Sequence, residues 1–240
     1  MMHGTRLSRA DVESAALYGA KASWPAGFAV YQRGGAADGL FIVLRGRIVL
    51  RSRVKAGRGF VPAIATVGET FGAEGISPDA VYVTDARADE PSETLHLSAS
   101  RFRSYVREQP QRALGLIAQV MSERAALLDK LRELSTLSVE QRIVSALVRM
   151  AATNTFVGDD GRITLDAAQY RLLCELVGAT RESVSLVFNR LVSDGLADRH
   201  GSGFVLRPAS ELSSRLASSW RDEEVPFQVG SDLIGPRAAL

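Results

Sequence analysis

The sequence contains little cysteine and histidine, and each shortage excludes a class of chemistry. The single cysteine, Cys174, rules out an intrachain disulfide and any iron–sulfur or zinc site built only from cysteines of one chain. The three histidines, His3, His96 and His200, are scattered and form no metal-binding or triad-like spacing. We therefore expect no metal, no cofactor and no enzymatic activity.

Long apolar runs and a strong net charge are missing as well. The longest apolar segments, such as GLFIVL at residues 39–44, have the length of a strand and fall short of the ~18 residues of a membrane span. The segment MMHGTRLSRADVES lacks the apolar stretch of a secretory signal, so we expect a cytoplasmic protein with no membrane partner. The formal net charge is +2, so any affinity for nucleic acid has to come from local placement of charges.

The remaining sequence falls into two parts of different character. A short helix is expected over residues 10–20. Residues 24–107 then hold runs of four to eight β-favouring residues bounded by glycine, proline or aspartate, which is typical of an all-β barrel or sandwich. From Pro110 to Leu137 the apolar residues return at helical spacing. They fit the a and d positions of a heptad repeat, interrupted by Arg124, at Leu114, Ile117, Met121, Leu128 and Leu131.

This helical stripe has two interpretations. A helix that packs only against its own domain needs an apolar face, and so does a helix that pairs with a second copy. A strict seam over nearly three heptads favours the second interpretation, because a symmetric dimer supplies a matching surface. We expect a dimerisation helix at residues 109–137.

The pattern after this helix predicts three shorter helices and a hairpin. Ser138 is a candidate N-cap for a helix over residues 137–152, and Thr164 is a candidate N-cap for a helix that ends at Gly178. After the turn GAT, the segment RESVSLVFNRLVSDG predicts a third helix that ends at Gly195, and RHGSGFVLR predicts a hairpin with a Gly-Ser-Gly tip. Helix, tight turn, helix and hairpin is the order of a winged helix-turn-helix.

Arg181 and Glu182 open the last of these helices. The first residues of the second helix of a helix-turn-helix contact base edges in the major groove. Arginine can bond a guanine edge in bidentate fashion, glutamate can accept from a cytosine amino group, and Ser185 follows one turn on. A solvated helix N-terminus also tolerates glutamate because of the helix dipole. The pair alone therefore does not separate a DNA reader from an ordinary surface.

Four motifs occur in order along the chain. They are the segment WPAGFAVYQRGGAADGLFIVLRGRIVL with its strand turn at residues 43–48, VGETFG at residues 67–72, LSVEQRIVSALVRMA after the long helix, and the S/T-R-E-x-V-S motif at residues 180–185. Together they resemble the CRP/FNR superfamily of bacterial transcription regulators, in which the first segment forms a β-roll. The resemblance covers roughly residues 24–217.

The resemblance implies an α+β fold in four parts. An N-terminal antiparallel, jelly-roll-like β-roll forms the sensor domain at residues 1–108, and the dimerisation helix follows at 109–137. A winged helix-turn-helix DNA-binding domain at 138–217 precedes a C-terminal tail at 218–240. The DNA-binding part holds nine arginines and nine acidic residues, so it must bind by placement and not by net charge.

The resemblance also implies partners and contacts. The expected partner is double-stranded DNA with an inverted repeat, bound by a homodimer. A contact with RNA polymerase is implied through the loop at residues 157–162, as in an activator, although the sequence leaves activation and repression open. Arg181, Glu182 and Ser185 would read bases. Supporting or phosphate contacts would come from Thr180, Leu186, Asn189, Arg190, Arg171, Arg199 and Ser202. The family has an arginine where Leu186 stands, and a leucine there can pack on a thymine methyl group.

The expected effector pocket departs from that of members that bind cyclic AMP. Gly68 and Glu69 match the start of the phosphate cassette. With the alignment anchored on residues 86–88, Tyr82 and Val83 stand where those members have an Arg-Ser pair, and Leu127 and Leu128 replace the polar residues that read the base. A phosphate needs a cation and short donors. We therefore expect no control by cyclic AMP, and a degenerate pocket that is empty, filled by side chains or adapted to an unknown effector.

Other sensing chemistries of the family are also disfavoured. One cysteine cannot supply the four-cysteine cluster of oxygen sensors, and we expect the three histidines to be solvated rather than haem ligands. We expect Cys174 to be a small, buried apolar side chain. Its oxidation would control DNA binding only if the thiol were exposed. An alternative from another class remains, namely a small-molecule binding module whose helix-turn-helix serves protein contacts.

Overall fold

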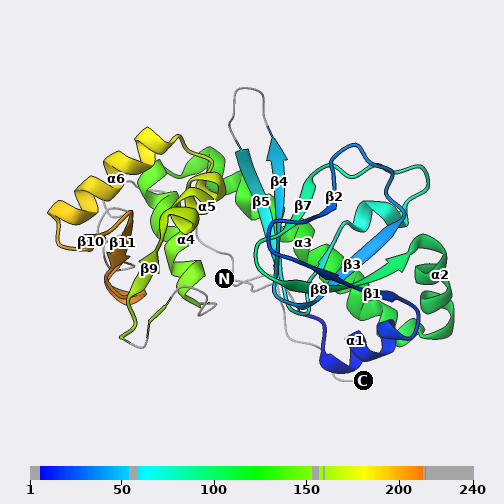
Figure 1. Ribbon diagram of the computed structural model, residues 1–240. Coiled ribbons are helices and arrows are strands. Elements are labelled where there is room, and N and C mark those ends of the chain that lie inside the picture. The colour runs from blue at the N-terminus through cyan, green and yellow to red at the C-terminus, as the bar shows by residue number, and fades with distance from the viewer. Residues whose placement is uncertain (1–5, 54–58, 153–156, 159, 213, 215–240) are drawn as a thin grey trace, which may run out of the picture.

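The computed structural model describes residues 6–53, 59–152, 157, 158, 160–212 and 214. It contains a β-roll and a winged helical unit, joined by the long helix α3 (Pro110–Thr136) (Figure 1). This arrangement confirms the predicted fold class. The C-terminal tail predicted at 218–240 and His3 lie outside the described residues.

The β-roll consists of two antiparallel four-stranded sheets. The first has the order β1 (Ala20–Trp24), β8 (Ser92–Ser98), β3 (Gly39–Arg45), β6 (Thr70–Phe71). The second has the order β2 (Ala29–Tyr31), β7 (Asp85–Ala88), β4 (Arg47–Arg53), β5 (Gly59–Thr66).

Strand β3 explains why the roll holds two apolar clusters. Its side chains alternate in direction, as in any strand. Leu40 and Ile42 pack with the helices on the outside of the roll, whereas Phe41 and Val43 pack into its interior. All four are buried, so β3 reads as a continuous apolar run and not as an alternating one.

The turn between β3 and β4 confirms the predicted strand turn at residues 43–48. Gly46 has φ 78°, a left-handed conformation that favours glycine. A Cβ there would lie 2.4 Å from Ser92 Oγ and 2.7 Å from the carbonyl oxygen of Pro91. The turn therefore requires glycine for two independent reasons.

Three helical segments accompany the roll: α1 (Arg9–Ala16), the 3₁₀ helix η1 (Ala73–Ile76) and α2 (Ala99–Glu108). Helix α1 confirms the short predicted helix but begins and ends earlier, because Ser8 and Asp11 form a capping box and the chain enters strand β1 at residue 20. Helix α2 was not predicted. It buries Phe102 and Tyr105 against the roll and Ser98 caps its start.

The winged unit comprises α4 (Val139–Ala152), β9 (Ile163–Leu165), α5 (Ala167–Val177), α6 (Arg181–Ser193), β10 (Ala197–His200) and β11 (Gly203–Leu206). The Ser138 cap is confirmed, since its Oγ accepts from Gln141 N at 3.2 Å. The prediction that Thr164 caps the helix ending at Gly178 is wrong. Thr164 lies in β9, which pairs with β11, and Asp166 caps α5 by accepting from the backbone of residues 168 and 169.

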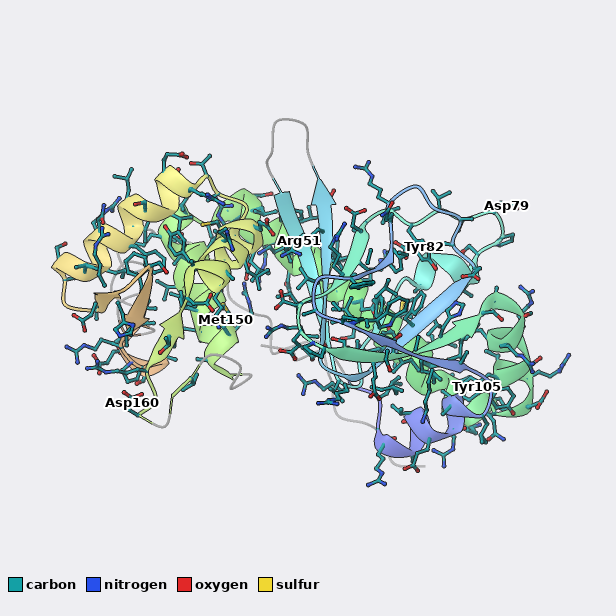
Figure 2. The ribbon with its side chains drawn as sticks, in the orientation of Figure 1. Arg51, Asp79, Tyr82, Tyr105, Met150 and Asp160 are labelled. Carbon is teal, nitrogen blue, oxygen red and sulfur yellow. The ribbon has the colours of Figure 1, made fainter. Side chains whose placement is uncertain are left out.

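The winged unit also contacts the roll directly. Leu172 of α5 packs in one buried cluster with Val49 and Val61 of β4 and β5. Beside them Arg51 Nε lies 2.9 Å from Glu175 Oε2, and Figure 2 shows Arg51 where the two units meet.

Among the described residues, no helix is both long and apolar enough to cross a membrane.

Candidate nucleic-acid interface and effector site

Helix α6 is held rigidly at its start and along one face. Gly178 ends α5 in a left-handed conformation with φ 63°. After the turn, Thr180 caps α6, because its Oγ1 accepts from Ser183 N at 3.3 Å. The inward side chains Val184, Val187, Phe188 and Leu191 are buried in the core of the winged unit.

The opposite face of α6 is open. Arg181, Glu182 and Ser185 are all exposed, and Figure 1 shows α6 at the outer edge of the winged unit, on the side away from the roll. The three predicted base readers therefore share one solvent-facing side over the first turn and a half. Glutamate in the first turn is also favoured by the helix dipole.

The predicted supporting residues differ in their surroundings. Three of them are engaged within the chain: Asn189 Oδ1 accepts from Arg199 Nη2 at 2.6 Å, and Arg190 Nη1 lies 3.3 Å from Glu140 Oε2. Arg199 also lies over the Phe204 ring, 5.6 Å from its centroid. Arg171 and Ser202 are simply exposed. The wing thus reaches α6 through Arg199 and helps fix the second half of its outer face.

The heptad seam of α3 is uncovered in the single chain. The exposed fractions are 57% for Leu114, 42% for Ile117, 53% for Met121, 56% for Leu128 and 60% for Leu131. Five large apolar side chains, all about half exposed, therefore follow one helix face, with Arg124 interrupting the row between Met121 and Leu128. Exposed apolar surface of this extent is typical of an interface.

Another face of α3 packs on the roll and carries polar groups that the sequence reasoning missed. Ala113, Leu116 and Gln119 are buried there, and Gln119 Oε1 has no hydrogen-bond partner among the described residues. One turn on, the Glu123 carboxylate accepts from the Thr70 hydroxyl of β6. Burial raises the pKa of Glu123 to about 7; the Thr70 hydrogen bond opposes this rise, and the carboxylates of Glu69 and Glu74 add to it.

The predicted pocket residues do not converge on a phosphate site. Tyr82 stacks on Tyr31 inside the roll, with ring centroids 3.7 Å apart and planes within 7°, and Figure 2 shows Tyr82 within the roll. Phe41 and Phe71 extend this aromatic cluster. A Cβ on Gly72, at the start of η1, would come within 3.0–3.3 Å of three of these rings.

The other predicted pocket residues lie elsewhere. The Glu69 carboxylate accepts from both Thr66 N at 2.8 Å and Thr66 Oγ1 at 2.9 Å, so it closes the turn that also contains Gly68. Val83 is exposed, and Leu127 and Leu128 are exposed on α3. The acidic groups where α3 meets the roll include Glu123, which the prediction did not contain.

Helix α3 also forms a hydrogen bond with the winged unit. Lys130 donates to the carbonyl oxygen of Leu176 at the end of α5, and Arg142 of α4 donates to that of Val177 at 2.7 Å. Burial, more than the nearby Arg149, lowers the pKa of Lys130 to about 8. Two cations on the last carbonyls of α5 match its dipole. The same helix therefore touches the roll through Glu123 and the helix-turn-helix through Lys130.

Cys174, His96 and His200 are the sensing candidates that lie within the described residues. Cys174 is 5% exposed, and burial raises the pKa of its thiol, so the condition for a redox gate is not met. His96 stacks on Phe41 and its Nε2 lies 3.2 Å from Asp38 Oδ1, so it is half-buried and not solvated as expected. His200 is exposed. No group of metal-ligating side chains occurs within the described ranges.

The predicted polymerase loop is only partly described. Val157 bridges to Ile163, Arg162 N donates to Asp160 Oδ1 at 3.0 Å, and Asp159 lies outside the described residues. Figure 2 shows Asp160 at the lower edge of the winged unit, far from the roll.

Known proteins match both units. The cyclic nucleotide-binding domain family matches residues 21–109, and the Crp-like helix-turn-helix domain family matches residues 141–223. The cyclic AMP receptor protein of Thermus thermophilus is 27% identical over 85% of this chain and 90% of its own length. The CRP-like cAMP-activated global transcriptional regulator of Mycobacterium tuberculosis is 22% identical over 80% of this chain and 86% of its own.

A solved structure has the same fold. The c-di-GMP responsive global regulator CLP of Xanthomonas campestris superposes with a TM-score of 0.73 at 21% identity, covering 83% of this chain and 99% of that one.

Proposed function

Because the chain belongs to the CRP/FNR superfamily of transcription regulators, we propose that it binds an inverted-repeat DNA site as a homodimer and is not controlled by cyclic AMP. The observation that carries the proposal is the open polar face of α6, with Arg181, Glu182 and Ser185 exposed on a helix whose other face is locked into the core. The expected domain boundaries at residues 108, 137 and 217 remain part of this proposal.

The uncovered seam of α3 supports the dimer. Its five apolar side chains need a partner of the same shape, and a second copy of the chain provides it by symmetry. A symmetric dimer presents two α6 helices, so the expected target is two half-sites about 34–36 Å apart. Arg181 and Glu182 then select a G·C pair in each half-site. Arg171, Arg190, Arg199 and Ser202 contact phosphates, and Thr180 holds the start of α6.

A cyclic nucleotide phosphate does not fit the residues at the α3 end of the roll. The Tyr31–Tyr82 stack occupies the interior, and the carboxylates of Glu69 and Glu74 lie close enough to Glu123 to raise its pKa. An anion placed there would meet these carboxylates, and the cation beside them, Arg6, already pairs with Glu69, its Nε 3.8 Å from Glu69 Oε1. The negative charge of the anion would therefore be poorly compensated at low dielectric. Control therefore rests on another effector, on protonation or on expression.

The first test is selection from a random duplex library with the purified full chain and no added ligand. The affinity for the selected site is then measured by fluorescence anisotropy at one fixed salt concentration, because phosphate contacts make affinity salt-dependent. The proposal predicts an inverted repeat whose affinity does not change when cyclic AMP is added. Recovery of no preferred sequence, with and without a cell extract, would contradict it and favour a binding module whose helix-turn-helix contacts proteins.

The contact with RNA polymerase through residues 157–162 is tested separately by transcription in vitro from a promoter that carries the selected site. A change in transcript level that is lost in the Asp160→Ala variant, with DNA affinity unchanged, supports the contact. An unchanged transcript level in that variant removes it.

A further inference from the structure

Leu186 is the exception on the outer face of α6. Its neighbours on that face are charged or polar, whereas the Leu186 side chain is 63% exposed to solvent. Single exposed leucines are common on protein surfaces. What matters here is its position, on the second turn of the helix that faces DNA in the proposed function.

The polar residues that follow Leu186 are already engaged within the chain. The Asn189 amide oxygen accepts from Arg199, and Arg190 pairs with Glu140. Only Ser185 and Leu186 are left between the first-turn readers and these engaged side chains. Contact with base edges beyond Arg181 and Glu182 therefore falls largely to one hydroxyl and one isobutyl group.

The floor of the major groove offers one apolar feature, the C5-methyl group of thymine. Leu186 lies five residues after Arg181, which is roughly 7.5 Å further along the helix axis. We infer that Leu186 packs against the methyl group of a thymine in each half-site, at a position other than the pair that Arg181 reads. This inference rests on the proposed function and adds a specificity determinant to it.

The contact predicts a defined discrimination. Uracil differs from thymine only by the absence of that methyl group, and it pairs with adenine in the same way. Withdrawing one methyl-sized apolar contact weakens binding by about fourfold per half-site, and by about 15-fold when both half-sites are changed.

The test replaces thymine by deoxyuridine, one position at a time and symmetrically, in the selected duplex. Anisotropy then gives the Kd for the wild-type chain, for Leu186→Ala and for Leu17→Ala. Leu17 is 82% exposed at the end of α1, so it supplies the same substitution away from α6. Circular dichroism checks that each variant is folded.

The expected result is a loss at one thymine position per half-site for the wild-type and Leu17→Ala chains. The same deoxyuridine replacement should leave the affinity of Leu186→Ala unchanged. Equal affinity for thymine and deoxyuridine at every position, equal sensitivity in Leu186→Ala, or a selected site without thymine in reach would each overturn the inference. In those cases selective binding by the wild-type chain still supports the proposed function, whereas loss of all selectivity removes both.

Discussion

Two helices of this chain leave one face uncovered, and the two faces are chemically opposite. The seam of α3 presents five apolar side chains, each 42–60% exposed. The outer face of α6 presents arginine, glutamate, serine and asparagine, with Leu186 as its one large apolar side chain among the described residues.

The difference in chemistry indicates which kind of binding partner suits each face. Apolar surface gains free energy when it leaves water and has little directional preference, so it suits a second copy with the same stripe. Donors and acceptors on a rigid helix gain little from burial alone but much from matched partners, so they suit the patterned edges of base pairs. We propose that the apolar face of α3 sets assembly and that the polar face of α6 sets the choice of DNA sequence.

Breaking the apolar face should have the largest effect. The Leu128→Glu variant places two carboxylates against each other across a symmetric seam, where burial without a partner is unfavourable. We expect dimerisation to weaken by at least about 100-fold, measured by sedimentation equilibrium. Leu17→Glu, the same change on the exposed end of α1, should remain dimeric. An unchanged dimer in Leu128→Glu would show that the seam does not pair.

Removing the leading charge of the polar face should affect DNA and leave assembly intact. Arg181→Ala loses a bidentate contact in each half-site, so we expect about 10–100-fold weaker binding and relaxed choice at one position per half-site. Sedimentation should still report a dimer. The control is Arg103→Ala, which removes an exposed arginine from α2. Equal losses in both variants would mean that Arg181 contributes only charge.

The face of α3 that packs on the roll differs from the exposed seam, because it buries the carboxylate of Glu123. The pKa of Glu123 is about 7 in the folded chain against 4.5 as its ordinary value. Between these values the folded chain holds a proton that the unfolded chain has lost, so stability falls as pH rises from about 4.5 to 7.

The Glu123→Gln variant should remove that slope and exceed the wild type in stability above pH 7 by about 3 kcal/mol. Urea unfolding at pH 5, 6, 7 and 8 measures this, and Glu13→Gln on α1 serves as a control with an exposed carboxylate. A wild type and a Glu123→Gln variant with parallel pH profiles would refute the assignment.

The smallest effect is expected at Cys174, which lies behind the polar face and not on it. Because the thiol is buried and its pKa is raised, iodoacetamide should label it only after unfolding. Treatment with a mild oxidant should change DNA affinity by less than about twofold. Rapid labelling of the folded chain, detected by mass spectrometry, would return the redox gate to consideration.

The sequence predicted the features that local patterns encode. Pro110 marks the start of α3, and Gly178 and Gly195 mark the ends of α5 and α6. Gly46 marks a turn in which a Cβ atom would clash with neighbouring atoms. Four ordered motifs then identified the family. These signals depend on neighbours along the chain, so they survive without knowledge of tertiary contacts.

The errors come from contacts between distant segments. Thr164 is a good cap residue, but pairing of β9 with β11 draws it into a strand and leaves the cap to Asp166. Helix α2 was missed because its ten residues are mostly polar and only Phe102 and Tyr105 are buried. Glu123 was not among the predicted residues, because only the packing of α3 on β6 brings it to Thr70.

We propose that the two uncovered faces act together, because the seam of α3 joins two chains so that the two α6 helices read two half-sites. The most direct measurement is the mass of the complex with the selected duplex, determined by sedimentation equilibrium. We expect two chains per duplex for the wild type and a single, weakly bound chain for Leu128→Glu. One wild-type chain per duplex, bound as tightly as Leu128→Glu, would contradict it.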